Sequence, residues 1–166
     1  MSARAILLLV ALLAAELVGA CGYETGLRVA ERHASIGVEI FGNDTHERDL
    51  ERPLHSEITR AVRDLTDAPL DDPAHAEVII RGTVRQFRRR GGVRDEDNHL
   101  LETGVYIEVE ASLIDRRSGR ALGPPKISAG WIGFVLDEQS NEAHARDRDM
   151  RKIADQVVLD LFAPVD

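Results

Sequence analysis

The sequence predicts an α+β domain in which two helices cover one face of a four-stranded sheet, in the order β-α-β-β-β-α. Several segments alternate apolar and polar residues, which is typical of half-buried strands. Two longer segments repeat apolar residues at steps of three and four, which is typical of amphipathic helices. Because each alternating strand has a single apolar face, we expect the helices to pack on that face.

The first strand and the first helix are predicted from a change of period. Residues 35–41 alternate as a strand, and residues 42–45, Gly-Asn-Asp-Thr, have the composition of a turn. The first helix is predicted near 49–66, with Pro53 in its first turn, where a missing N–H is harmless. The strand should direct one set of side chains to the core: Ile36, Val38 and Ile40. The helix should bury one stripe: Leu50, Leu54, Ile58, Ala61, Val62 and Leu65.

Three more strands and a final helix are predicted downstream. The strands are expected over residues 77–87, 105–113 and within 127–135, with a hairpin turn at Ser118-Gly119. The final helix is expected near 141–162. In the second strand, Val78, Ile80, Gly82 and Val84 should face one way, and Ile79, Arg81, Thr83, Arg85 and Phe87 the other. The apolar stripe of the final helix comprises Ala143, Met150, Ile153, Ala154, Val157, Val158 and Leu161.

Residues 1–20 have the pattern of a lipoprotein signal peptide. Arg4 supplies a positive charge, and residues 6–15 form an apolar stretch shorter than the ~20 residues that span a bilayer. The segment Val18-Gly19-Ala20-Cys21 is similar to a lipobox, in which small residues precede a cysteine that receives lipid. Several acyl chains are needed for stable anchoring, because one chain binds a membrane only marginally.

We therefore expect Cys21 to carry the lipid anchor, with a buried apolar cysteine as the alternative. Residues 21–34 are expected to form a tether, followed by a single domain over 35–166. Gly22 is compatible with export to the outer membrane, by resemblance to lipoproteins in general. The expected location is the periplasmic face of that membrane.

Composition and motifs argue against several other functions. A formal net charge of −8 makes general nucleic-acid binding a poor expectation, and the single cysteine permits no intrachain disulfide. The six histidines lack the i, i+4 spacing of a metal site, and no nucleophile elbow, phosphate-binding glycine loop or HExxH motif occurs. We expect no enzyme activity, no cofactor and no metal.

A series of motifs resembles the lipopolysaccharide-assembly lipoproteins of the LptE family, over nearly the whole chain from Cys21 onward. In chain order the motifs are Cys21-Gly22-Tyr23, Val38-Glu39-Ile40-Phe41-Gly42-Asn43-Asp44-Thr45, Leu50-Glu51-Arg52-Pro53-Leu54, Thr59-Arg60-Ala61-Val62, Ala76-Glu77-Val78-Ile79-Ile80-Arg81-Gly82 and Asp115-Arg116-Arg117-Ser118-Gly119. The chain departs from the family in the short segment after the first helix, at Gly42, and over residues 128–135.

The resemblance implies a partner-binding role. Such lipoproteins sit inside an outer-membrane β-barrel called LptD and help it to assemble and to place lipopolysaccharide in the outer leaflet. The expected partners are thus an LptD-like barrel, lipopolysaccharide and the membrane. Two alternatives remain open: a periplasmic lipoprotein that activates a cell-wall enzyme or supports a secretion pore, and an enzyme.

An arginine-rich segment is the candidate ligand site. Arginines are frequent and acids absent over residues 81–94, and guanidinium groups suit phosphates and carboxylates. The candidate lipopolysaccharide-binding residues are Arg88, Arg89, Arg90 and Arg94. Alternatively, Asp95, Glu96 and Asp97 neutralise this group at a solvated hairpin tip, while Arg81 and Arg85 pair with Glu108 and Glu110 of a neighbouring strand.

Overall fold

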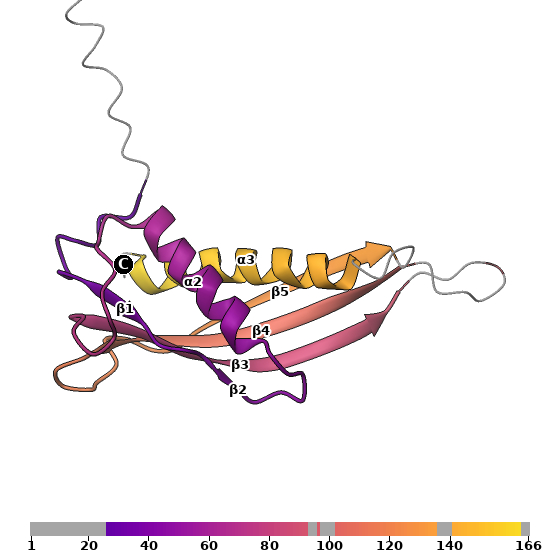
Figure 1. Cartoon of the computed structure of the whole chain (residues 1–166), viewed down its shortest axis with the longest axis horizontal. Coiled ribbons are helices and arrows are strands. Elements are labelled where there is room, and N and C mark those ends of the chain that lie inside the picture. Colours follow the sequence, from indigo (N-terminus) through magenta and orange to yellow (C-terminus); the bar gives the residue numbers. More distant parts are fainter. Residues whose placement is uncertain (1–25, 93–95, 97–101, 136–140, 164–166) are drawn as a thin grey trace, which may run out of the picture.

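The computed structural model describes residues 26–92, 96, 102–135 and 141–163. They form the predicted α+β architecture, with both helices of the described chain on one face of a mixed sheet (Figure 1). The elements are β1 (Ile36–Val38), β2 (Gly42–Asn43), α2 (Glu51–Leu65), β3 (Val78–Gly91), β4 (Glu102–Asp115), β5 (Lys126–Val135) and α3 (Asn141–Phe162). The predicted signal peptide, Cys21 and Arg94 lie outside the described residues.

The sheet has the order β1-β3-β4-β5, and β2 also pairs with β3. The pairings of β3 with β4 and of β4 with β5 are antiparallel, whereas β1 and β2 run parallel to β3. Parallel neighbours need a long crossover connection, and α2 lies in the connection between β1 and β3. The mixed sheet follows from this one crossover.

The predicted first strand is divided into β1 and β2, and its core assignment is wrong at Ile40. The side chain of Ile40 is 67% exposed, whereas that of Phe41 is 2% exposed. The break between the two strands changes which side chains point toward the helices. Phe41 lies against Gly82, where an added Cβ would be 2.3 Å from Phe41 Cε1, so glycine there is a packing requirement.

The predicted turn at residues 42–45 is also displaced. Gly42 and Asn43 pair with β3 as strand β2. The turn follows them, where the Asn43 side-chain oxygen accepts hydrogen bonds from Thr45 N (3.0 Å) and Thr45 Oγ1 (2.7 Å). A short polar side chain therefore still directs the turn, but from within the strand.

Phe87 was predicted on the same face as Arg81 and Arg85, and this prediction is wrong. The register between β3 and β4 shifts between Val84 and Gln86, which places an extra residue in β3. Such a bulge reverses the alternation of the residues that follow it. Phe87 consequently packs against the core, partly buried, on the side covered by the helices.

The predicted helical stripes are confirmed over most of their length. The buried residues of α2 are Leu54, Ile58, Ala61 and Val62. The buried apolar residues of α3 are Ala145, Met150, Ile153, Ala154, Val157, Val158 and Phe162, while Ala143 is exposed. Ion pairs also join the helices: Arg60 contacts Asp155 at 2.6 Å and Arg151 contacts Glu57 at 3.3 Å.

A buried carboxylate lies where α3 crosses β5. Asp149 is fully buried, and neither of its carboxylate oxygens has a hydrogen-bond partner among the described residues. It occupies space left by Gly130, where an added Cβ would be 1.9 Å from Asp149 Oδ1. Burial raises the pKa of Asp149 to about 6, against the opposing effect of Lys152.

This pKa links stability to pH. The folded pKa lies above the ordinary value of 3.8, so the folded chain binds the proton more tightly than the unfolded chain. The carboxyl group's stabilising contribution is therefore complete below pH ~4 and is lost as the pH rises through about 6. The raised pKa corresponds to a cost of roughly 3 kcal/mol when Asp149 is ionised.

We predict that Asp149→Asn stabilises the domain at pH 8 by roughly 1–3 kcal/mol, because it removes the buried charge and keeps the side-chain shape. The advantage should shrink toward pH 4.5, where the parent carboxyl is protonated. Denaturant unfolding at several pH values measures it, with Asp147→Asn on the exposed face of α3 as the matched control. Parallel pH profiles for the parent and Asp149→Asn would contradict the assignment.

Candidate functional site

The candidate site lies on the face of the sheet opposite α2 and α3, which no described helix covers (Figure 1). Alternation along β3, β4 and β5 directs the polar set of side chains to this face. It also carries two large exposed apolar side chains of β5: Ile127 is 63% exposed and Trp131 is 46% exposed. The face therefore combines charged and apolar groups.

Arginines near the β1 and β2 side of this face are paired with acids. Arg81 Nη2 donates to Glu39 at 2.9 Å, and this pairing lowers the pKa of Glu39, chiefly through the side-chain hydrogen bond. Arg85 pairs with Asp44 and donates to Glu110 at 2.8 Å. The expected pairing of Arg85 with Glu110 is thus present, while Arg81 pairs with Glu39. Such exposed pairs contribute little stability.

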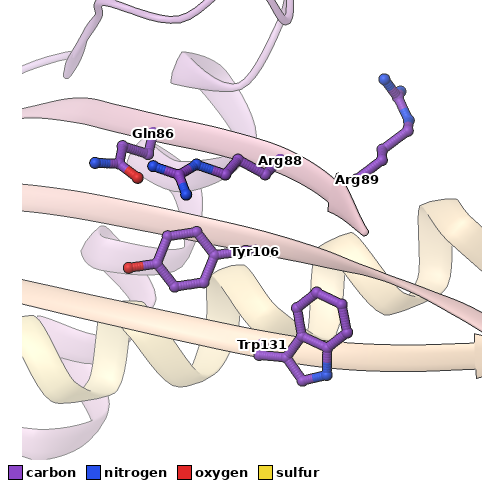
Figure 2. A pocket seen from close by; sticks show the side chains of 5 residues that line it. All are labelled: Gln86, Arg88, Arg89, Tyr106 and Trp131. Carbon is purple, nitrogen blue, oxygen red and sulfur yellow. The ribbon is translucent and has the colours of Figure 1, made fainter. Parts of the chain in front are cut away.

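The structure places Arg88 and Arg89 apart. Figure 2 shows the Arg89 side chain pointing away from the other labelled residues, because consecutive residues of a strand face opposite sides. Arg89 contacts Glu47 at 3.1 Å and lies 5.1 Å from the centre of the Phe87 ring. The guanidinium of Arg88 lies 6.0 Å from the centre of the Tyr106 ring, a cation–π contact. The Arg90 side chain and Arg94 are outside what the structure describes.

Arg88 differs from the other arginines of β3 whose side chains are described. Arg81, Arg85 and Arg89 each form an ion pair, whereas no carboxylate of the described residues lies within ion-pair distance of Arg88. Its charge is therefore not balanced by an ion pair in the described part of the chain.

A pocket of about 450 Å³ surrounds Arg88 and is lined by Gln86, Arg88, Arg89, Tyr106 and Trp131. These residues come from β3, β4 and β5, and Figure 2 shows Tyr106 between Arg88 and Trp131. The Trp131 indole lies against Gly104, where an added Cβ would be 2.5 Å from Trp131 Cζ2. The absence of a side chain at Gly104 thus provides the space for the indole.

Tyr106 is held in place by a neighbouring acid. Its hydroxyl donates to Glu108 Oε2 at 2.8 Å, and this hydrogen bond is the main reason that the pKa of Tyr106 is raised. The pocket therefore offers guanidinium groups, an amide and two aromatic rings. This set can bind an anionic group and an apolar surface at the same time.

Sequence reasoning identified Arg88 but missed Gln86, Tyr106 and Trp131. Tyr106 was assigned to the polar face of its strand, and an aromatic residue among polar ones was an available signal. Trp131 lies in the strand predicted within residues 127–135, whose side chains were not assigned to faces. The described residues contain no group of three or more His, Cys, Asp or Glu side chains suited to a metal ion. None of the described helices is long and apolar enough to cross a membrane.

Comparisons with known proteins show similarity to bacterial lipoproteins in structure. No protein-family model and no curated sequence matches the chain. A Xanthomonas campestris protein of family DUF330 has a TM-score of 0.52 and 12% identity, covering 76% of this chain and 83% of that one. A minor lipoprotein from Acinetobacter baumannii has a TM-score of 0.48 and 16% identity, covering 79% and 92%. Lipoprotein GNA1162 from Neisseria meningitidis has a TM-score of 0.48 and 11% identity, covering 75% and 98%. At these identities the likeness concerns the fold.

Proposed function

We propose that the chain is a lipid-anchored lipoprotein at the periplasmic face of the outer membrane, which binds an LptD-like barrel and supports lipopolysaccharide assembly. The observation that carries this proposal is the sheet face that no described helix covers. One pocket on this face holds two aromatic side chains and Arg88, which has no acidic partner among the described residues. A face of this kind suits a ligand or partner that has both anionic and apolar groups.

The sequence supports the anchor and the family. The lipobox-like segment before Cys21 supports lipidation, and the ordered motifs from Cys21 to Gly119 support the LptE-like assignment. The role is non-catalytic: the chain binds and positions, and it carries out no chemical step. We assign no cofactor to it.

The basic residues are proposed to contact the phosphates of lipopolysaccharide. In this function Arg88 is the principal contact, since its charge has no acidic partner among the described residues. Arg89 can contribute only by leaving Glu47, which makes its contribution smaller. Arg90 and Arg94 stay part of the proposal on their sequence positions.

The barrel partner provides the direct test of this function. We predict that affinity purification of the chain from detergent-solubilised envelopes recovers an LptD-like outer-membrane barrel in comparable amount. The matched control is an unrelated lipoprotein of similar size carrying the same tag. Recovery of a cell-wall enzyme or of a secretion pore in place of the barrel would favour the rival function.

The anchor is tested at Cys21. We predict that Cys21→Ala abolishes lipidation, because the thiol that accepts the lipid is lost, and leaves an unprocessed or soluble periplasmic chain. Membrane fractionation and intact-mass measurement report the outcome, with the parent chain in parallel. A variant that remains cleaved, lipidated and membrane-bound would show that the lipobox assignment is wrong.

The basic residues are tested by neutralisation. Replacing Arg88, Arg89, Arg90 and Arg94 by Gln should weaken lipopolysaccharide binding by at least ~10-fold at low salt, because charge-assisted hydrogen bonds are lost. Added salt should weaken the parent more than the variant. Arg81→Gln is the matched control, since Arg81 is already paired with Glu39. Equal affinities of parent and variant at low salt would remove these residues from the site.

A further inference from the structure

We propose that the connection between β4 and β5, residues 116–125, is a lipid-contact surface that touches the headgroups of an anionic bilayer and orients the anchored domain. We call this segment the β4–β5 loop. The inference deepens the proposed function and rests on its lipid anchor at Cys21. The loop follows the end of β4 that pairs with the start of β3, whereas Arg88 lies toward the other end of the same pair (Figure 1).

The β4–β5 loop and its borders are basic, although the chain as a whole is acidic. Residues 115–127 include four basic side chains and one acid, whereas the formal net charge of the chain is −8. The one acid, Asp115, accepts a hydrogen bond from the Ser118 N–H at 2.6 Å inside the turn. None of the four basic side chains forms an ion pair with an acid of the described residues: Arg116, Arg117, Arg120 and Lys126. Their charges are therefore available to an anionic surface.

The same segment exposes apolar side chains. The side chain of Leu122 is 50% exposed, and that of Ile127, at the start of β5, is 63% exposed. Pro124 and Pro125, which lie between them, are exposed as well. Apolar side chains beside basic ones suit the boundary between lipid headgroups and acyl chains, where both kinds of group find partners.

Backbone hydrogen bonds hold the β4–β5 loop in one shape. Asp115 N donates to Arg120 O at 2.9 Å, and Leu122 N donates to Leu113 O at 2.8 Å. Gly119 has a φ of 69°, which glycine adopts without strain and which closes the turn. Because the loop is already ordered, contact with a surface requires little additional ordering of the chain.

The chain departs toward Cys21 from the same end of the molecule. Figure 1 shows the start of the described chain and the β4–β5 loop at one end of the longest axis. Leu27 N donates to Leu65 O at 2.7 Å, which fixes the point of departure. Four residues separate Cys21 from Gly26, and five extended residue steps span at most ~18 Å. An acylated Cys21 therefore holds this end of the domain close to the bilayer.

Glu77, next to the start of β3, connects the two segments. Its carboxylate accepts the Ala34 N–H at 2.6 Å, and its backbone oxygen accepts the Arg116 N–H at 3.1 Å. The loop is thus fixed relative to the segment that leads to the anchor. Asp71 and Asp72, exposed in the connection between α2 and β3, are repelled by an anionic surface. We therefore expect the contact to be made through the β4–β5 loop, whose guanidinium groups match lipid phosphates.

The experiment measures how close the loop lies to the bilayer in the acylated chain. Gly123→Cys introduces a thiol for a fluorescent label, at a position where an added Cβ meets no atom within 4 Å. Ala143→Cys, exposed near the start of α3, is the reference position toward the opposite end of the molecule (Figure 1). Cys21 is the only native cysteine, so acylation of its thiol leaves the introduced thiol as the one that reacts. The labelled chains are reconstituted into phosphatidylcholine vesicles with or without phosphatidylglycerol, which also contain a lipid with a quencher on its headgroup.

We expect the label at position 123 to be quenched more strongly than the label at position 143, and only when phosphatidylglycerol is present. Replacing three basic residues by Gln should lower the ratio of contacting to free orientations by at least ~10-fold, since each basic residue near an anionic surface contributes a factor of about five. These residues are Arg117, Arg120 and Lys126. Added salt should have the same effect.

The matched control removes the same charge from exposed positions outside the loop. Its substitutions, Arg48→Gln, Arg52→Gln and Arg148→Gln, change residues that form no ion pair with the described acids, and they should preserve the quenching at position 123. An equal loss of quenching in the control would overturn the assignment to the loop, because the effect would then follow net charge alone.

Equal quenching of the two labels would overturn the proposal, as would quenching at position 123 that does not need phosphatidylglycerol or that persists in the loop variant. Shielding of that label that rises with protein density and not with phosphatidylglycerol would identify a second copy as the occupant and would also overturn it. Intact mass reports acylation of Cys21 separately, and a chain without acylation would lose both the proposed function and this surface. An acylated chain that recovers the barrel but keeps the loop away from lipid would keep the function and lose this surface alone.

Discussion

The antiparallel pairing of β3 with β4 is the interaction on which the rest of the structure depends. It runs from Val78 opposite Asp115 to Gly91 opposite Thr103. The two short strands join β3, and β5 joins β4. Because side chains alternate across a pleated sheet, the register of this pair decides which residues face the helices and which face outward. The bulge after Val84 is part of the same constraint, since it turns Phe87 inward and leaves Gln86 and Arg88 outward.

The two faces of the sheet obey different physical requirements. The helix-covered face is almost entirely apolar, so burial of its area drives folding. Asp149 of α3, which packs against this face at Gly130, is an exception. Burial destabilises the ionised form of Asp149, and its side chain fits only because residue 130 is glycine. On the outward face, the arginines near β1 and β2 are neutralised by nearby acids, while the distal end carries Arg88 with Tyr106 and Trp131. This difference in charge balance is what distinguishes a candidate site from a solvated surface.

The proposed function rests on two parts of the chain, the N-terminal motifs and the outward face of the sheet with its pocket. The anchor and the family resemblance rest on short motifs, of which Cys21 lies outside the described residues and stays a prediction. The pocket rests on contacts among strands and requires no lipid. The fold, which is similar to that of a Xanthomonas campestris protein of family DUF330 at only 12% identity, accommodates many different surface residues. The site residues are therefore the features that differentiate one such protein from another.

The sequence by itself determined the type and order of the main elements, because local periodicity records which face of a strand or helix is buried. The α+β class, both helices and three of the strands follow from it, as does the pairing of Arg85 with Glu110. Only the tertiary structure decided the division of the first strand, the inward position of Phe87 and the outward position of Ile40, because bulges and strand breaks depend on the neighbouring strand. The pocket, too, could be located only from the tertiary structure. Its residues come from β3, β4 and β5, and the register between these strands cannot be inferred from the periodicity of any one of them.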